Sequence, residues 1–160
     1  MSPSIPSFTI AALFISPGHN YFGHHGKEQG EHPILEVDEI ECVAGRGIRN
    51  DRFFDFKPDY KGQITFFAWE VYARTCAELG LRDKGPGLFR RNVITRGVDL
   101  NNLVGREFEV QGVRFSGTSE CAPCYWMDHA FAPGMEKLLE GNGGLRCRIL
   151  SDGWLRRVIH

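Results

Sequence analysis

Apolar and polar residues alternate with a period of two over much of the chain, a pattern typical of short β-strands. The alternation at 34–43 changes phase after Val37, which predicts a strand with a bulge. Residues 107–117 alternate on both sides of Gln111-Gly112, as in a β-hairpin. Strands are predicted at about 8–15, 34–43, 62–67, 88–96, 107–117, 145–149 and 154–159.

Helical periodicity is clear in one segment, which Gly80 ends. Its apolar positions follow the spacing i, i+3, i+4, i+7, i+8 and i+11 of a single helix face: Ala68, Val71, Tyr72, Thr75, Cys76 and Leu79. Residues 133–140 predict a second, short helix, and Cys76 and Cys147 are expected in the core. The predicted fold class is therefore mostly β with helical additions (α+β), most economically a closed or partly closed antiparallel β-barrel, in a single domain over 1–160 with its core at about 8–159.

Composition limits the functions that this domain can have. The 160 residues carry 19 basic and 20 acidic side chains, a net charge of −1, so no broad field attracts nucleic acid or an acidic membrane. An odd number of cysteines, five, argues against a secreted disulfide framework and favours the cytoplasm. No apolar segment has the length needed to span a bilayer, so we expect neither nucleic acid nor a membrane as a partner.

A long loop is predicted at 16–33, where histidines occur among glycines and prolines. No carboxylate or thiol keeps a recognisable metal-ligand spacing with His19, His24, His25 and His32. A metal site is therefore disfavoured. A role for His19, His24 and His25 as a lid or as substrate-facing residues remains open beside that of an ordinary surface loop.

The main candidate for chemistry is the segment Cys121-x-x-Cys124. Two cysteines at this spacing can form a disulfide, bind a soft metal, or present one activated thiolate. A thioredoxin-like pair opens a helix early in an α/β chain, and here no helical periodicity follows. A structural zinc site needs further ligands, such as His129 and Cys147, and the second half of a paired pattern is missing. The third interpretation is one thiolate ligand to a metal-containing cofactor, whose anionic part is held by arginines and turn amides.

Arginines occur at two further places that matter to an anionic ligand. Asp51-Arg52 is, from spacing alone, more simply a surface ion pair than an anion site. Arg90 and Arg91 lie next to each other in a segment expected to be extended, so at most one of them should face any given pocket.

Several motifs in one order resemble the MOSC domain family, named after the C-terminal domain of molybdenum cofactor sulfurases. The likeness runs from about Phe8 to the C-terminus. The motifs are Gly45-x-Gly47-x-x-x-Asp51-Arg52, Gln63-Ile64-Thr65, Phe89-Arg90-Arg91-Asn92, Gly97-x-Asp99-Leu100, Leu103-Val104-Gly105 and Cys121-x-x-Cys124. The family often has glycine where this chain has Asn50, and asparagine also tolerates a left-handed backbone.

The resemblance implies a β-barrel domain that binds the molybdenum cofactor, in which a phosphorylated pterin holds molybdenum through a dithiolene. By position, Cys124 corresponds to the molybdenum ligand and the catalytic residue. Arg90 and Asn92 match residues that hold the pterin and its phosphate. The same resemblance makes Arg52, Thr118 and Cys121 candidate cofactor-binding residues.

The function that the resemblance implies is oxo transfer, the reduction of N-hydroxylated or N-oxide compounds with electrons from a separate reductase. The alternative is a non-catalytic carrier that passes the cofactor or its terminal sulfur to another enzyme. A structural zinc domain or a dithiol redox domain is a third hypothesis. Pyridoxal phosphate and cysteine desulfuration are not expected, because no lysine is placed as a Schiff-base partner and no aminotransferase-like domain is present.

Overall fold

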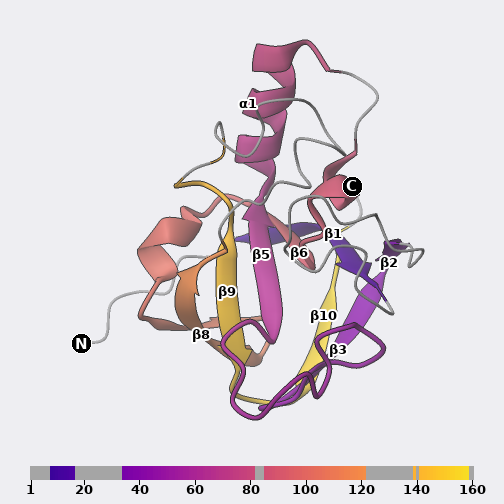
Figure 1. Ribbon diagram of the computed structural model, residues 1–160, viewed down its shortest axis with the longest axis vertical. Coiled ribbons are helices and arrows are strands. Elements are labelled where there is room, and N and C mark those ends of the chain that lie inside the picture. Colours follow the sequence, from indigo (N-terminus) through magenta and orange to yellow (C-terminus); the bar gives the residue numbers. More distant parts are fainter. Residues whose placement is uncertain (1–7, 17–33, 82–84, 122–138, 140, 159–160) are drawn as a thin grey trace, which may run out of the picture.

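Residues 8–16, 34–81, 85–121, 139 and 141–158 are described by the computed structural model (Figure 1). They form a mostly β structure with one α-helix, consistent with the predicted α+β class. The helices are α1 (Trp69–Leu79) and the short 3₁₀ helices η1 (Pro86–Phe89) and η2 (Leu100–Leu103). The strands are β1 (Thr9–Ile15), β2 (Leu35–Val37), β3 (Glu39–Val43), β4 (Gly47–Ile48), β5 (Ile64–Ala68), β6 (Val93–Arg96), β7 (Glu107–Val110), β8 (Val113–Glu120), β9 (Leu145–Ile149) and β10 (Gly153–Arg156).

The strands form two sheets. One has seven strands in the order β2-β1-β6-β5-β9-β8-β7, and the other has three in the order β10-β3-β4. The predicted strand at 34–43 is divided at Asp38, so that β2 and β3 belong to different sheets rather than to one bulged strand. Between the described strands, hydrogen bonding does not close the sheets into a ring, so the predicted barrel is not confirmed.

A crossover unit lies at the centre of the larger sheet. Strand β5 leads into α1, which rises from the end of the strand in Figure 1, and the chain returns in β6, parallel to β5. The helix ends where the sequence predicted, because Gly80 adopts φ of 66° in the left-handed region. Every other strand pairing is antiparallel among the described residues.

Adjacent phenylalanines in β5 serve two separate cores, because successive side chains of a strand point to opposite faces. Phe66 packs edge-on against Phe115, with ring centroids 5.4 Å apart, and contacts Phe108 at 5.7 Å. Phe67 stacks on Phe89 at 4.5 Å. Both faces of β5 are therefore buried at this point. In the described part of the chain, no helix is long and apolar enough to cross a membrane.

Gly117 is the place where the segment after η2 contacts β8. An added Cβ atom there would lie 2.0 Å from the carbonyl oxygen of Leu103, a backbone atom that cannot rotate away. We expect Gly117→Ala to lower the free energy of unfolding by about 2–3 kcal/mol, measured by urea denaturation. Gly85→Ala is the control, because a Cβ atom added at Gly85 would have nothing within 4 Å. Equal stabilities of the two variants would contradict the contact.

Cys42 and Cys147 are fully buried, as the alternation predicted for Cys147. Burial, with a smaller effect of Glu41, raises the pKa of Cys42 to about 12, and burial raises the pKa of Cys147 well above its ordinary value. Since the thiolate is the nucleophile, both thiols should resist iodoacetamide at pH 8 in the native protein and react in urea, as read by mass spectrometry. Labelling of Cys42 as fast as that of the half-buried Cys76 would contradict this expectation.

The same pKa shift makes stability depend on pH at the alkaline end. The pKa of Cys42 is higher in the folded chain than in the unfolded chain, so folding favours the protonated thiol. The contribution of the protonated Cys42 thiol to stability is complete below about pH 8.5 and is lost as the pH rises toward 12. The free energy of unfolding is therefore expected to fall above pH 9.

Candidate functional site: a buried arginine cluster

The turn after β4 places Asp51 and Arg52 inside the protein. Asn50 adopts φ of 73°, the left-handed conformation expected of it. The Asp51 carboxylate accepts hydrogen bonds from the backbone N–H of Ser16 (2.9 Å) and of Phe53 (3.3 Å). The side chains of Arg52 and Asp51 are 8% and 0% exposed, so the prediction of a surface ion pair is wrong.

The Arg52 guanidinium is only partly satisfied by the protein. Its Nη2 donates to the carbonyl oxygen of Arg90 at 2.9 Å, and its Cζ atom lies 4.8 Å from the centre of the Phe53 ring. Among the residues that the structure describes, its Nη1 has no hydrogen-bond partner; it is buried and lies 3.7 Å from Asp51 Oδ1, too far for a hydrogen bond. Burial lowers the pKa of Arg52, Asp51 opposes this shift, and the nearby charge of Arg91 lowers the pKa further. A buried guanidinium with an unused donor fits an anionic ligand.

Arg90 and Arg91 are both buried. Arg90 caps η1 with φ of 56°, so it is left-handed, and the expectation of an extended backbone at this residue is wrong. Arg90 Nη2 donates to Ser16 Oγ at 2.8 Å. Arg91 Nε donates to the carbonyl oxygen of Gly143 at 3.0 Å, and its Nη2 to that of Cys121 at 3.4 Å. Arg91 thereby joins the end of β8 to the turn before β9.

The Asn92 side chain is occupied by hydrogen bonds within the protein and has a structural role. Its Oδ1 accepts from the backbone N–H of Thr65 (3.0 Å) and from Thr65 Oγ1 (3.1 Å). Its Nδ2 donates to the carbonyl oxygen of Phe14 (3.1 Å) and to Asp51 Oδ1 (3.4 Å). The amide is thus fully used, 1% exposed, and holds β1, β5 and the Asp51 turn together. It acts on the site by positioning Asp51.

Cys121 lies at the end of β8, close to the arginines. Its thiol is free and buried, and its backbone N–H donates to the carbonyl oxygen of Gly144 at 2.8 Å. Its carbonyl oxygen accepts from Arg91 Nη2 at 3.4 Å, which places Cys121 beside that guanidinium. The catalytic candidate Cys124 and the lid candidates His19, His24 and His25 lie outside the described residues.

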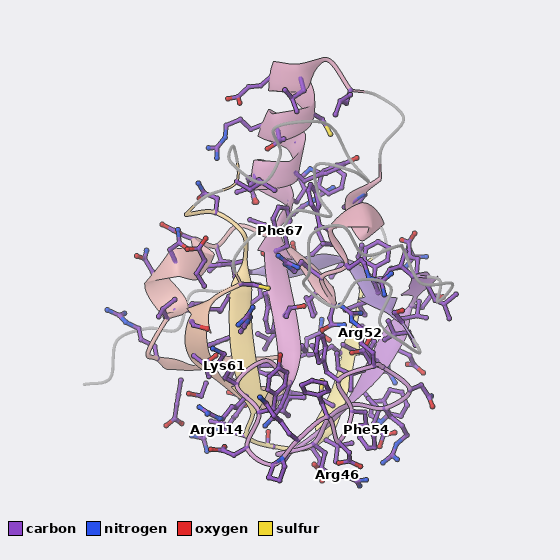
Figure 2. All side chains as sticks on the ribbon, in the orientation of Figure 1. Arg46, Arg52, Phe54, Lys61, Phe67 and Arg114 are labelled. Carbon is purple, nitrogen blue, oxygen red and sulfur yellow. The ribbon has the colours of Figure 1, made fainter. Side chains whose placement is uncertain are left out.

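Thr118, another predicted cofactor residue, forms a bulge in β8. The register shifts between Gly117, which pairs with Cys147, and Ser119, which pairs with Arg146. The Thr118 hydroxyl lies 2.7 Å from the carbonyl oxygen of Lys61 and 3.0 Å from that of Arg146, so it has two backbone acceptors already. The segment that Thr118 contacts runs from Arg46 to Lys61. Figure 2 labels Arg46, Arg52, Phe54 and Lys61 along it.

Thr65, Arg146 and Ser119 form a row of paired residues that the sequence did not reveal. Arg146 lies opposite Thr65 on one side and opposite Ser119 on the other, which makes one row of side chains across β5, β9 and β8. Only strand pairing creates this row, because the three residues are far apart in sequence. An arginine in an alternating strand has no signal that separates it from an ordinary solvent-facing residue.

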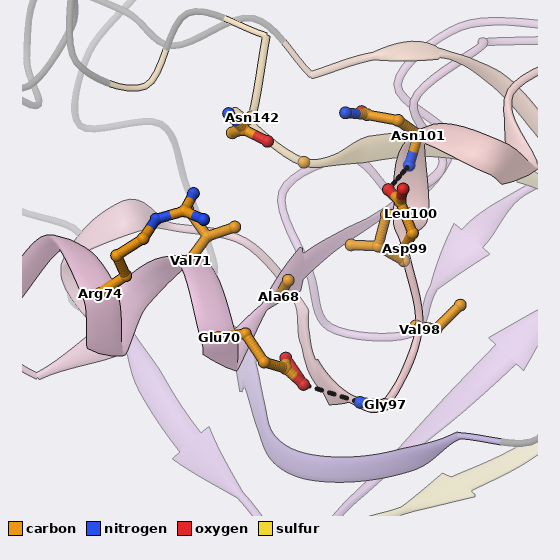
Figure 3. Close-up of a pocket in the computed structure, with 11 residues that line it drawn as sticks. Ala68, Glu70, Val71, Arg74, Gly97, Val98, Asp99, Leu100, Asn101 and Asn142 are labelled. Atoms are coloured by element: carbon orange, nitrogen blue, oxygen red, sulfur yellow. Dashed lines mark hydrogen bonds between the residues drawn. The ribbon is translucent and has the colours of Figure 1, made fainter.

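A separate cavity of about 430 Å³ lies beside the first turn of α1 (Figure 3). Its walls include Val71, Arg74, Leu100 and Asn142, and Glu70 accepts a hydrogen bond from the Gly97 N–H at 2.7 Å. The cavity and the arginine cluster share the 142–144 turn. The buried cations and Cys121 belong to the cluster and not to this cavity, so we place the candidate site at the cluster.

The fold and this cluster define an α+β domain with buried guanidinium groups at the ends of its central strands. The chain belongs to the MOSC domain family, whose model matches residues 23–157. This family is associated with binding of the molybdenum cofactor. A comparison with curated proteins found no match.

Solved structures share the fold at low sequence identity. The YUAD protein of Bacillus subtilis superposes with a TM-score of 0.69 and 19% identity, over 93% of this chain and 91% of that chain. YiiM of Geobacillus stearothermophilus superposes with a TM-score of 0.67 and 14% identity, over 94% and 71%. YiiM of Escherichia coli has a TM-score of 0.60 and 17% identity, over 90% and 65%. This chain thus spans about two thirds of the length of the Escherichia coli protein.

Proposed function

We propose that this domain binds the molybdenum cofactor and uses it in oxo transfer. The observation that carries the proposal is the Arg52 Nη1 atom, a buried donor that has no hydrogen-bond partner among the described residues and lies beside Asp51. A buried donor without a partner costs about 1–3 kcal/mol, so its retention is explained by a ligand that satisfies it. A phosphorylated pterin has the anionic oxygens that a guanidinium binds best.

Each residue has a distinct part in this proposal. Cys124 supplies the thiolate to molybdenum, a soft ligand for a metal that accepts sulfur. Arg52 and Arg90 neutralise the anionic part of the cofactor, and Cys121 packs beside it. Asn92 positions Asp51, which in turn holds Arg52. When bound, the cofactor supplies the two-electron chemistry, and the chain controls its orientation and its exposure to water.

The proposed reaction is reduction of an N-hydroxylated or N-oxide compound, with electrons from a separate reductase. The alternative is a carrier that delivers the cofactor or its terminal sulfur without turnover. Both require a bound cofactor. They differ in whether the loaded protein reduces a hydroxylamine with an artificial electron donor.

The test measures molybdenum and pterin in protein purified from cells that make the cofactor. We expect near one molybdenum per chain, loss of molybdenum in Cys124→Ser, and its retention in Cys121→Ser, the matched control. Zinc in place of molybdenum would contradict the proposal. Loss of molybdenum in Cys121→Ser alone would reverse the assignment of the ligand.

Hydroxylamine reduction then separates the enzyme from the carrier. Turnover that depends on molybdenum content and disappears in Cys124→Ser supports oxo transfer. A fully loaded protein that shows no turnover with benzamidoxime or hydroxylamine contradicts oxo transfer and supports the carrier.

A further inference from the structure

The bulge in β8 determines which side chain meets Arg146. Gly117 pairs with Cys147, so an unbroken ladder would place Thr118 opposite Arg146. The extra residue instead brings Ser119 opposite Arg146, while Thr65 of β5 pairs with Arg146 on its other side. Side chains directly opposite each other in neighbouring strands lie about 5 Å apart at Cβ. Arg146 is therefore within reach of both hydroxyl-bearing residues.

Two members of this row lack partners. Ser119 Oγ is buried without a hydrogen bond, and the half-buried Arg146 guanidinium forms no ion pair or hydrogen bond in the described part of the chain. The contrast on the same strand is Arg148, whose Nε lies 2.9 Å from Asp59 Oδ1. An uncompensated arginine beside an unused hydroxyl provides a set of donors without an acceptor.

A hydrogen-bond network runs from Thr65 of this row to Asp51, which lies beside Arg52. Thr65 Oγ1 donates to Asn92 Oδ1, and Asn92 Nδ2 donates to Asp51, the carboxylate that lies beside Arg52. Arg52 also has an unused, buried donor, and its side chain is 8% exposed. Thr65 thus links the row that contains Arg146 and Ser119 to the carboxylate beside Arg52.

We propose that Arg146 and Ser119 form a binding site for a phosphate monoester, the phosphate end of the ligand whose other anionic groups meet Arg52. Arg146 supplies a positive charge and two parallel N–H donors, a geometry that matches phosphate oxygens. Ser119 supplies one O–H donor. This assignment deepens the proposed function, because it adds two residues that neither the family motifs nor the spacing of the sequence indicated.

The test uses inorganic phosphate and the full chain, purified from cells that cannot make the cofactor. Titration calorimetry at constant ionic strength is expected to show binding, weakened about tenfold or more in Arg146→Met, because a charge-assisted hydrogen bond contributes about 1.5–3 kcal/mol. Arg146→Lys keeps the charge without the paired donors. Its affinity for phosphate should lie between those of the unmodified protein and Arg146→Met. Arg148→Met, on the same strand and already paired with Asp59, should bind as the unmodified protein does.

Ser119→Ala separates binding from folding. It should weaken phosphate binding while leaving the free energy of unfolding unchanged or slightly raised, because it removes a buried hydroxyl that has no partner. Unchanged phosphate binding in both Arg146→Met and Ser119→Ala would overturn the proposal, as would equal weakening by Arg148→Met or no binding by the unmodified chain.

Cofactor-loaded protein identifies the source of the phosphate. Loss of the binding of inorganic phosphate on loading supports the cofactor's own phosphate as the occupant, and undiminished binding supports a phosphorylated substrate. Phosphate binding by a chain that never acquires molybdenum would leave this site supported and the proposed function refuted. A chain that acquires molybdenum but does not bind phosphate would support the proposed function and refute this phosphate site.

Discussion

Asn92→Asp is expected to lower the free energy of unfolding by roughly 3–5 kcal/mol at pH 7. The substitution keeps the oxygen that accepts from Thr65 but replaces Nδ2, which donates to the Phe14 carbonyl and to Asp51. The Phe14 carbonyl loses a donor, and a second carboxylate is placed beside Asp51 in a position that is 1% exposed. Neither change can be compensated by water, because the site is closed.

Urea denaturation at pH 7 and near pH 4 measures this effect. The introduced carboxyl is buried beside another carboxylate, so its pKa in the folded chain should exceed its unfolded value. The loss of stability is then largest at neutral pH and shrinks as the pH falls and the group takes up a proton. Asn102→Asp, at an exposed position, is the control and should change stability by less than about 0.5 kcal/mol. An Asn92→Asp variant as stable as this control would show that the hydrogen bonds of Asn92 are not needed.

Arg52→Met is expected to reduce cofactor binding strongly and the stability of the fold moderately. The affinity for the cofactor should fall about tenfold or more, which lowers the content of molybdenum and pterin after purification, because the guanidinium that meets the anionic cofactor is lost. The free energy of unfolding should fall by about 1–3 kcal/mol, because the Arg90 carbonyl oxygen loses its donor Nη2 and the buried Asp51 loses its cationic neighbour. Asp51 keeps its hydrogen bonds from Ser16, Phe53 and Asn92 in this variant.

Arg49→Met is the matched control on the same turn. Arg49 is exposed and pairs with Glu41 at 2.7 Å, so its loss should leave the molybdenum content unchanged. Metal analysis and pterin fluorescence of both variants, with urea denaturation alongside, complete the comparison. Full molybdenum content in Arg52→Met would contradict a role for this guanidinium in cofactor binding. A large loss of stability with a proportional loss of molybdenum would indicate a structural role instead.

Local pattern was sufficient for most of the fold. The alternation around Gln111-Gly112 predicted the β7–β8 hairpin, and both turn residues have positive φ. The helix spacing predicted α1 and its end at Gly80. These features are decided by residues that are close in the chain, so their periods and turn residues are readable without the tertiary structure.

Pattern was less informative wherever distant segments decide the outcome. The change of phase after Val37 was visible, but not that β2 and β3 join different sheets. The Asp51–Arg52 pair looked like a surface ion pair, because the residues that bury it, Ser16 and Asn92, come from two other parts of the chain.

The amino-acid order by itself determined the α+β class, the hairpin, the helix and the likeness to the MOSC domain family, because each depends on short-range periodicity or on motifs that can be compared directly. The tertiary structure alone decided the burial of Arg52, the structural role of Asn92 and the row formed by Thr65, Arg146 and Ser119. Desolvation and strand register are properties of the assembled sheet. They depend on which distant segments exclude water from a side chain, and no local pattern carries that information.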